Sequence, residues 1–372
     1  MQAWDRPAPE LGPRNRANAT QLSRADLRAL VERLGEAPWR GDQVFEGLYK
    51  HRFGSWEEFT TLSKGLRAKL AEAADIAWPE IVQSVPSQDG STKHVFRLAD
   101  GKEIEGVHMP YENRTTLCLS SQIGCAMGCT FCATGQMGIL RNLLPGEISG
   151  QVVSMLRHHG PSLRKGEAGP LNPAPLNIAP LNIVFMGMGE PLHNLDNLMA
   201  AFEIVTDSLG LAMSPKRITL STSGLVSGIE KLAGFPKRPR LAVSLNGTTD
   251  EYRSKIMPVN RVWNLEALVS ALERFPLQTN ERITLEYVLL KGVTDSLEDG
   301  NRLVKLASRF PSKVNLIPFN PHEGSGFEPP TEARVSQLCR LLSEEDVIVS
   351  VRRSRGQDVA GACGQLARPR GH

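Results

Sequence analysis

The stretch TTLCLSSQIGCAMGCTFCATGQMG, residues 115–138, joins a short apolar strand to a loop that carries three cysteines. Its first part, TTLCLS, has the β-branched and apolar composition of a buried strand. Downstream, strand-like and helix-like segments alternate, which indicates repeated βα units on a parallel sheet. Six such units are too few for an eight-stranded barrel. The sequence therefore predicts an α/β fold of the open, partial (β/α)6 barrel type, with its chemistry at the C-terminal ends of the strands.

The predicted elements follow one another closely along the chain. The six strands cover residues 115–120, 182–187, 217–222, 240–245, 282–290 and 313–319. The six helices cover residues 147–159, 194–209, 225–233, 264–275, 296–310 and 331–345, and a last strand covers 346–353. Ahead of the barrel, helical periodicity over residues 20–75 predicts a small helical unit, and two short strands are predicted at 94–98 and 103–109.

These patterns divide the chain into five parts. They are a flexible arm (1–19), a helical accessory domain (20–78), a β extension (79–111), the partial barrel (112–351) and a C-terminal tail (352–372). Between the first helix and second strand of the barrel, a segment rich in proline and glycine contains Pro-Leu-Asn three times. Its composition predicts a surface loop over residues 161–181.

Composition excludes several classes of protein. Of 372 residues, 41% are hydrophobic and 22% are charged, which is ordinary globular usage and excludes a disordered or collagen-like chain. No apolar run reaches the roughly 18 to 20 residues that span a bilayer, and the charged N-terminus lacks a signal-peptide pattern. We therefore expect a cytoplasmic protein with no membrane partner. The net charge of +3 is too small by itself to indicate nucleic-acid binding.

Four of the six cysteines fall between residues 118 and 132, which favours metal or redox chemistry over a disulfide scaffold. Cys125, Cys129 and Cys132 form a C-x-x-x-C-x-x-C loop directly after a strand. Three thiolates so close together can hold one small metal site and leave one coordination position open. The alternative is a zinc site, for which His108, His158 or His159 would supply the fourth ligand.

Polar residues follow several predicted strands. The run Met-Gly-Met-Gly-Glu-Pro, residues 186–191, lets the backbone approach a ligand and offers Glu190 as a partner for an amino group. Ser221, Ser244, Asn246 and Asn320 occupy equivalent strand ends. Cys339 shares helical spacing with Val335 and Leu342, so we expect it to pack in the interior.

With Phe131 before the last cysteine, the loop resembles the signature of radical S-adenosylmethionine (SAM) enzymes. The resemblance extends to the RlmN and Cfr family of radical SAM RNA methyltransferases and covers residues 20–367. The runs that carry it are NRTTLCLSSQIGCAMGCTFCATGQMG (113–138), IVFMGMGEPLHN (183–194), RITLSTSG (217–224), LAVSLNGTTDEYRSKIMPVNR (241–261) and RRSRGQDVAGACGQLA (352–367).

The resemblance implies the cofactors and their ligands. Cys125, Cys129 and Cys132 would bind one 4Fe-4S cluster. Two SAM molecules would be used per turnover, one as methyl donor and one as radical source. The residues implied in SAM binding are Gly189, Glu190, Ser221, Ser244, Leu245, Asn246 and Asn320. The family often has histidine at the position of Asn246.

Three further residues would be catalytic by the same resemblance. Cys363 would accept a methyl group to become S-methylcysteine, and Cys118 would later form a disulfide with it and release the product. Glu105 would be the general base. The implied product is adenosine methylated at carbon 2, in 23S rRNA at the peptidyl-transferase centre and in tRNA on the 3′ side of the anticodon.

The expected partners are these two RNAs and an external one-electron donor such as flavodoxin or ferredoxin, with the enzyme a monomer. The basic clusters available for RNA are Lys216 with Arg217, Lys237 with Arg238 and Arg240, residues 352–355, and Arg164 with Lys165 in the Pro-Leu-Asn loop. The helical domain has a nearly balanced charge, so it would contribute shape more than attraction.

Three alternatives remain open from the sequence. A Cfr-type enzyme would methylate carbon 8 of the rRNA adenine. A glycyl-radical activase shares the three-cysteine loop but does not need Cys118 and Cys363 as a pair. An iron-sulfur or zinc module that only binds RNA would not cleave SAM.

Overall fold

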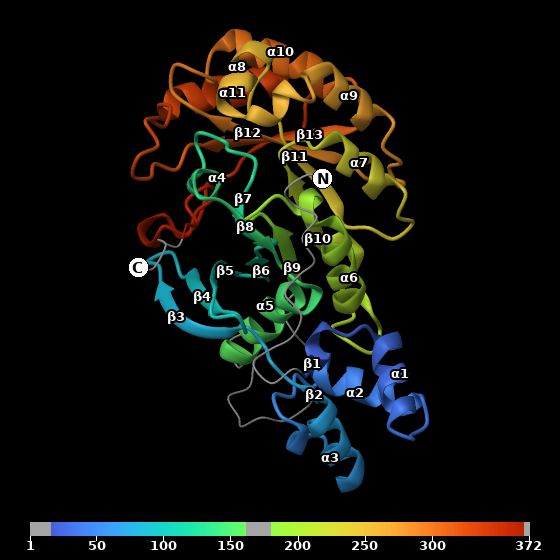
Figure 1. Cartoon of the computed structure of the whole chain (residues 1–372). Coiled ribbons are helices and arrows are strands. Elements are labelled where there is room, and N and C mark those ends of the chain that lie inside the picture. The colour runs from blue at the N-terminus through green and yellow to red at the C-terminus, as the bar shows by residue number, and fades with distance from the viewer. Residues whose placement is uncertain (1–15, 161–179, 368–372) are drawn as a thin grey trace.

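A single mixed sheet of ten strands organises the computed structural model, which describes residues 16–160 and 180–367 (Figure 1). The strand order is β14-β13-β12-β11-β10-β9-β6-β5-β4-β3. Seven neighbouring strands are parallel: β6 (Arg114–Cys118), β9 (Leu181–Phe185), β10 (Ile218–Thr222), β11 (Arg240–Ser244), β12 (Ile283–Leu289), β13 (Ser312–Pro318) and β14 (Val349–Val351). The predicted α/β partial barrel is confirmed.

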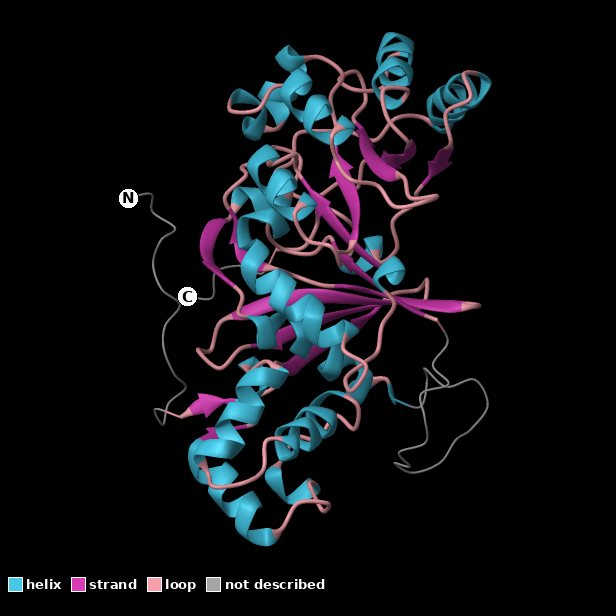
Figure 2. Cartoon of the chain, turned by 90° about the vertical axis from the view of Figure 1, so that its right-hand side faces the viewer, coloured by secondary structure: helices cyan, strands magenta, loops and turns pink. Residues whose placement is uncertain are grey.

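The predicted helices follow the parallel strands. They are α5 (Pro145–His158), α6 (Leu195–Thr206), α7 (Val226–Ala233), α9 (Leu265–Glu273), α10 (Leu297–Ala307) and α11 (Glu332–Glu344). Figure 1 places α8 to α11 together beside β12 and β13, and Figure 2 shows the helices packed against the strands. One continuous apolar core lies between these layers. It includes Leu117, Ile183, Leu220, Val243 and Leu285 from five adjacent strands, all at most 1% exposed.

Three short elements around the cysteine loop and β11 were not predicted. They are the hairpin of β7 (Gln122–Cys125) and β8 (Gly138–Asn142), the helix α4 (Ala133–Gln136) and the helix α8 (Asp250–Ile256). The hairpin depends on Gly124, whose φ is +74°, and a Cβ at this position would lie 1.9 Å from the carbonyl oxygen of Gly138. The sequence pattern does not predict this hairpin, because its glycine and polar residues show no alternation of apolar and polar positions.

Three antiparallel strands extend the sheet beyond β6. They are β3 (Glu80–Pro86), β4 (Thr92–Arg97) and β5 (Glu103–Tyr111). The strands predicted at 94–98 and 103–109 correspond to β4 and β5. Within the predicted β extension, β3 itself was not identified, because most of its residues are exposed and it lies at the sheet edge, without an apolar alternation.

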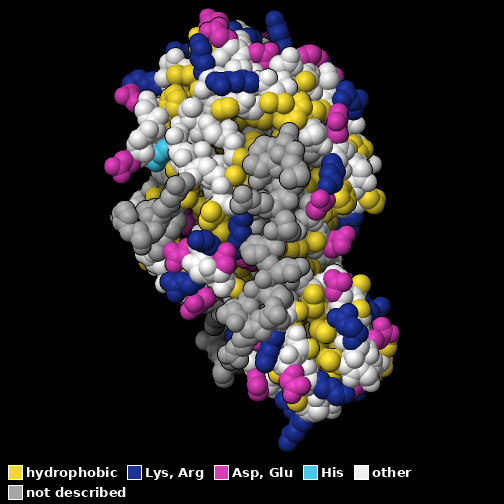
Figure 3. All heavy atoms as spheres, in the orientation of Figure 1, with side chains coloured by type: hydrophobic (Ala, Val, Ile, Leu, Met, Phe, Trp, Pro, Cys, Tyr) yellow, Lys and Arg dark blue, Asp and Glu magenta, His cyan; other side chains and the backbone are white. Residues whose placement is uncertain are grey.

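The helical unit contains α1 (Arg24–Arg33), α2 (Trp39–Tyr49) and α3 (Lys64–Ala73) around its own apolar core, which includes Leu27, Phe45 and Leu70. Ser23 and Asp26 form a capping box that begins α1. In Figure 3 this unit is the lobe at the lower right, where basic and acidic side chains are interspersed. That surface agrees with the expected balance of charge.

The prediction of a flexible arm over residues 1–19 was wrong for the last residues of that range. Ala17–Asn18 forms β1, which pairs in parallel with β2 (Ala74–Asp75). The pairing partner is more than 50 residues away in the sequence, so no local pattern predicts it. Residues 1–15 lie outside the described part of the chain, as does most of the predicted Pro-Leu-Asn loop with Arg164 and Lys165.

A search of the described ranges, 16–160 and 180–367, finds no helix that is both long and apolar enough to cross a bilayer. The cytoplasmic location stays a prediction.

Arg253 on α8 links the ends of two barrel strands, β10 and β11, by hydrogen bonds. It is fully buried, and its guanidinium donates to the carbonyl oxygens of Leu245 (2.8 Å) and Ser223 (2.6 Å) and to the Asn260 side chain (2.8 Å). Burial lowers the pKa of Arg253 to about 10. The side chain therefore stays charged at neutral pH and satisfies three acceptors that would otherwise be buried without partners.

We expect Arg253→Met to lower the free energy of unfolding by about 3 kcal/mol, since each buried acceptor left without a donor costs about 1–3 kcal/mol. Urea unfolding of the full chain measures this change. Arg340→Met, at an exposed position on α11, is the matched control and should change stability by less than about 0.5 kcal/mol. Equal stability of the two variants would contradict the assigned role.

Candidate functional site

A cavity of about 160 Å³ lies at the C-terminal ends of the parallel strands. One ordered water needs only about 10–15 Å³, so the cavity is large enough for a small molecule. Its lining includes nearly all the residues predicted to bind a cluster or SAM: Cys125, Cys129, Cys132, Gly189, Glu190, Ser221, Ser244, Asn246 and Asn320. Cys363, from the distant C-terminal segment, also lines it. The structure thus brings these groups together, as expected for the ends of adjacent parallel strands.

The three clustered cysteines have free thiols held by short elements. Cys125 ends β7, and Cys132 directly precedes α4. Burial raises the pKa of Cys125 to about 12 and also raises the pKa values of Cys129 and Cys132. In the cofactor-free chain these thiols are therefore protonated, and a bound metal would supply the positive charge that stabilises them as thiolates.

The arrangement of the thiols favours an iron-sulfur cluster over a zinc ion. Among the described residues, the group of three metal-ligating side chains close enough to share one ion is His94, His158 and His159, not the three cysteines. The histidines considered as a fourth zinc ligand, His108, His158 and His159, do not line the cysteine cavity. The chemistry of three thiols around one cavity fits a group larger than a single ion.

Glu190 is the carboxylate of this cavity. The side chain is 3% exposed and accepts hydrogen bonds from the backbone N–H groups of Ser223 (2.7 Å) and Leu192 (3.1 Å). Burial raises its pKa, while the hydrogen bonds oppose that shift. Gly189 precedes it with φ of +104°, where a Cβ would lie 2.6 Å from the Gln122 side chain. A carboxylate fixed in this way is suited to pair with the ammonium group of a ligand.

The other strand-end residues have partners within the protein. Ser221 donates to Glu286 at 2.5 Å, and the side-chain oxygen of Asn246, at a φ of +49°, accepts from the backbone of Val288 at 2.8 Å. Leu245 is 1% exposed and does not line the cavity. Its side chain packs in the apolar core directly after the end of β11, so its predicted role in SAM binding stays a prediction.

The C-terminal segment is fastened over the cysteine loop. Asn320 donates to the carbonyl oxygen of Cys363 (3.0 Å), and the backbone N–H of Ala133 donates to the carbonyl oxygen of Gly364 (2.8 Å). Thr134 adds a hydrogen bond to the carbonyl oxygen of Leu366. These contacts hold Cys363 at the cavity, so in this structure Asn320 positions the C-terminal segment as well as lining the cavity.

Cys118 and Cys363 line a second, smaller cavity together with Met186 and Arg352. Both thiols are free. Burial, and next the negative charge on Cys363, raises the pKa of Cys118 to about 12, while Arg352 opposes the shift. The structure therefore places two cysteines that are 245 positions apart in the sequence beside one cationic side chain.

Glu105 lies on β5 outside both cavities. It is 3% exposed, its Oε2 accepts from the backbone N–H of Ala367 at 2.9 Å, and its Oε1 lies 3.3 Å from Lys93 Nζ. The predicted base is thus buried, and in this structure it binds the C-terminal segment.

Glu286 and Arg352 were not predicted as site residues. Glu286 on β12 is 5% exposed and accepts from Ser221 and from Arg352 Nη1 at 2.9 Å. The sequence contains a signal for Glu286, because it lies within the largely apolar run RITLEYVLL. A carboxylate in a buried strand needs a specific partner, which indicates a functional or structural role. Arg352 was considered only as part of a basic cluster.

Two known families match separate parts of the chain. The Radical SAM superfamily matches residues 119–303, and the family described as "Ribosomal RNA large subunit methyltransferase N-terminal domain" matches residues 17–76. The second range corresponds to β1 through β2 and includes the three-helix unit.

Relatives resemble the chain over almost all of its length. A protein of Myxococcus xanthus named "Dual-specificity RNA methyltransferase RlmN 2" is 46% identical, over 97% of this chain and 93% of the relative. A protein of Geobacter sulfurreducens named "Dual-specificity RNA methyltransferase RlmN" is 45% identical, over 93% of this chain and 90% of the relative. A crystal structure of a radical SAM methyltransferase from Sphaerobacter thermophilus has a TM-score of 0.87 at 38% identity, covering 94% of this chain and 99% of that one.

Arg352 generates a testable prediction about Cys363. The negative charge on Cys363, followed by those on Glu286 and Cys118, raises the pKa of Arg352 against the effect of burial. Arg352→Gln removes the cation that lines the same cavity as Cys363. Because iodoacetamide reacts with a thiolate and a nearby cation favours that form, we expect it to alkylate Cys363 several-fold more slowly in this variant.

Peptide mass spectrometry at fixed pH measures that rate. Arg353→Gln is the matched control, because Arg353 lies next in sequence, has a side chain 63% exposed and pairs with Glu332 at the surface. Equal alkylation rates in the wild type and Arg352→Gln would show that the guanidinium does not act on Cys363.

Proposed function

Since the chain belongs to the RlmN family of radical SAM methyltransferases, we propose that it methylates carbon 2 of adenosine in 23S rRNA and in tRNA. The carbon-8, activase and binding-module alternatives are not favoured by relatives named as dual-specificity RNA methyltransferases. The observation that carries the mechanism is that Cys363 lines two cavities, one with the three clustered cysteines and Glu190, the other with Cys118 and Arg352.

The proposed cofactor ligands are the residues of the larger cavity. Cys125, Cys129 and Cys132 would hold a 4Fe-4S cluster, and Glu190, Ser221, Ser244, Asn246 and Asn320 are proposed to bind SAM, with Gly189 giving it room. When bound, SAM and the reduced cluster supply a methyl group and a carbon radical able to abstract hydrogen. Only the backbone of Leu245 is available for a contact, because its side chain is in the core.

Cys363 is proposed to carry the methyl group as S-methylcysteine. Carbon 2 of adenine is electron-poor and has no nucleophilic electron pair for a sulfonium methyl group, so an ordinary displacement fails. A methylene radical on the Cys363 sulfur can instead add to that carbon and join enzyme and RNA covalently. Arg352, which pairs with Glu286 and lines the same cavity as Cys363, would stabilise the Cys363 thiolate before that thiolate attacks the methyl group.

Cys118 is proposed to release the product. The ring proton and one electron first leave the adduct, and the electron would return to the redox group held by the three clustered cysteines. The Cys118 thiolate then attacks the Cys363 sulfur and forms a disulfide. The sulfur–carbon bond breaks in this step, and the released methylene carbon keeps the electron pair and takes up a proton to become the methyl group. The burial that raises the pKa of Cys118 opposes this step, and the nearby Arg352 favours it. We further propose that an external one-electron donor of the flavodoxin or ferredoxin class reduces the enzyme, and that the enzyme acts as a monomer.

Glu105 is proposed as the base that removes the ring proton. In this structure its carboxylate accepts a hydrogen bond from the backbone N–H of Ala367. Action on the substrate therefore requires that this part of the C-terminal segment separate from β5. Lys93, 3.3 Å away, remains to hold the carboxylate in place.

The RNA is proposed to approach from the opposite ends of the strands. A cavity of about 490 Å³ is lined by basic residues at or near the starts of strands: Arg114, Lys216, Arg217, Arg240, Arg282 and Lys313. It shares Met109, Tyr111, Met186 and Arg352 with the cavity of Cys118 and Cys363. Burial lowers the pKa of Lys313, and the nearby Arg240 lowers it further.

Several basic residues expected to contact RNA have other partners. Arg238 is 6% exposed, pairs with Glu281 at 2.8 Å and lies over the Phe275 ring. Arg353 pairs with Glu332, and Arg355 lies 3.6 Å from Asp89. Lys216, Arg217, Arg240 and Arg352 are the members of the predicted clusters that line the basic cavity.

The central test is anaerobic incubation of the reconstituted enzyme with reductant, methyl-labelled SAM and unmodified rRNA or tRNA. We expect nucleoside mass spectrometry to detect labelled 2-methyladenosine from the wild type. Cys363→Ala should yield none while SAM cleavage continues, because only the methyl carrier is removed. Cys339→Ala, on α11 outside the site, is the matched cysteine control and should retain activity.

Two results would contradict this assignment. Formation of 8-methyladenosine would show that the enzyme methylates carbon 8 instead of carbon 2. Full activity of Cys363→Ala would show that Cys363 is not the methyl carrier. Cys118→Ala tests the release step separately, since it should accumulate a covalent protein–RNA adduct rather than free product.

The basic cavity predicts the salt dependence of RNA binding. Arg217→Ala should weaken binding and reduce the slope of log affinity against log salt by about 0.7–0.9, the value for one lost phosphate contact. Arg340→Ala, exposed on α11 and outside this cavity, is the control. Fluorescence anisotropy over a salt series measures both, and an unchanged slope in Arg217→Ala would exclude this entry face.

A further inference from the structure

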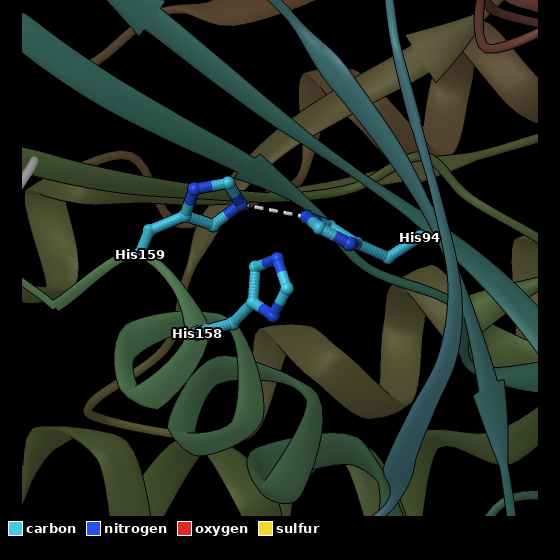
Figure 4. Close-up of side chains that lie close together, drawn as sticks. All are labelled: His94, His158 and His159. Carbon is cyan, nitrogen blue, oxygen red and sulfur yellow. Dashed lines mark hydrogen bonds between the residues drawn. The ribbon is translucent and has the colours of Figure 1, made fainter.

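Three histidine side chains from two elements converge outside the proposed active site (Figure 4). His94 lies on β4, His158 is the last residue of α5, and His159 caps that helix. Their ligand nitrogen atoms all lie within 4.8 Å of one another. None of the three lines the cavities of the cysteine loop, Cys363 or the basic strand starts. The proposed methyl transfer therefore leaves this histidine cluster without a function.

The hydrogen bonds of the cluster place two ring nitrogens against each other. Nε2 of His94 lies 2.7 Å from Nε2 of His159, and Nδ1 of His94 lies 2.9 Å from the Ser84 hydroxyl. Two neutral imidazole nitrogens can share only one proton between them. When Nδ1–H of His94 donates to Ser84, its Nε2 presents a lone pair toward His159, which is the tautomer that a metal ion requires.

A fourth histidine adds an independent indication of a ligand. His108 on β5 stacks on His159 with ring centroids 3.9 Å apart and an interplanar angle of 14°. The side chain is 4% exposed, yet neither ring nitrogen has a hydrogen-bond partner within the described ranges. Buried polar atoms without partners are uncommon in folded proteins, and one explanation is an ion or water bound beside them.

The electrostatic state of the rings suits metal binding. Burial, followed by the neighbouring imidazoles, lowers the pKa of His94 to about 3 and that of His108 to about 4. Burial and His158 lower the pKa of His159 to about 4. At neutral pH these rings are therefore uncharged and have lone pairs available.

We propose that His94, His158 and His159 bind a divalent transition-metal ion of the zinc class, with a water molecule as the fourth ligand. A tetrahedral zinc ion with bonds of about 2.0–2.1 Å holds its nitrogen ligands about 3.3 Å apart. In the present structure one separation is 2.7 Å and none exceeds 4.8 Å, so the three nitrogens already lie near the spacing that zinc requires. His108 would donate to or accept from the bound water. Because the site offers three imidazoles and no carboxylate, it does not favour magnesium or calcium, which prefer oxygen ligands.

The site would have a structural consequence for the catalytic residues. It joins β4 to the end of α5, and Lys93, adjacent to His94, lies 3.3 Å from Glu105. Lys93 also contacts the carbonyl oxygen of Ala360 in the C-terminal segment at 3.5 Å. A metal ion at the cluster would therefore restrain the strand that contacts both Glu105 and the segment bearing Cys363.

The test measures zinc on the full chain with its iron-sulfur cluster in place, so that the clustered cysteines are occupied. After dialysis against micromolar free zinc, elemental analysis should find one zinc per chain in addition to the iron. X-ray absorption at the zinc edge should find nitrogen or oxygen neighbours at about 2.0–2.1 Å. His158→Ala and His159→Gln should each weaken zinc binding at least about tenfold.

The variants separate binding from folding. His158 is exposed, so His158→Ala should fold normally, whereas His94 is fully buried and is not used as the principal variant. His51→Ala, at an exposed histidine of the helical unit, is the matched control and should bind zinc as the wild type does. Sulfur neighbours at about 2.3 Å, no retained zinc, or unchanged binding in His158→Ala and His159→Gln would each overturn the proposal. None of these results depends on methyl transfer.

Discussion

The attachment of the C-terminal segment to the cysteine loop is the constraint on which the site depends. Two hydrogen bonds join residues more than 200 positions apart: the backbone N–H of Ala133 donates to the carbonyl oxygen of Gly364, and the hydroxyl of Thr134 donates to that of Leu366. Asn320, at the end of β13, adds the hydrogen bond to the carbonyl oxygen of Cys363. These bonds fix the backbone at Cys363 and directly after it. With them Cys363 becomes part of the wall of both cavities, between the clustered cysteines and Cys118.

The parallel sheet separates two kinds of chemistry at its two ends. The thiols and Glu190 gather beyond the C-terminal ends of the strands, whereas basic residues occupy the strand starts. Arg352 and Met186 contact the space between them. The barrel therefore has a buried, thiol-lined cavity at one end of its strands and a positively charged cavity at the other.

Buried polar side chains hold the strand ends in register. Glu286 joins β10 to the C-terminal segment through Ser221 and Arg352, and Arg253 joins the ends of β10 and β11 through backbone carbonyl groups. Each of these groups would be costly to bury alone and is stable because its partners are complete. The lining of the larger cavity is therefore fixed before any ligand enters, which lowers the entropy lost on binding.

The sequence by itself determined the βα alternation, the three-cysteine loop and the polar strand ends, because each is a local pattern with a fixed period or spacing. It also indicated Cys118 and Cys363, although only through family resemblance. Tertiary structure alone decided that Leu245 points into the core, that Glu286 meets Arg352, that Ala17–Asn18 pairs with Ala74–Asp75, and that four histidines from β4, β5 and α5 share one place. These are contacts between residues distant in the chain, and their geometry depends on how the layers pack rather than on any periodicity that a linear sequence carries.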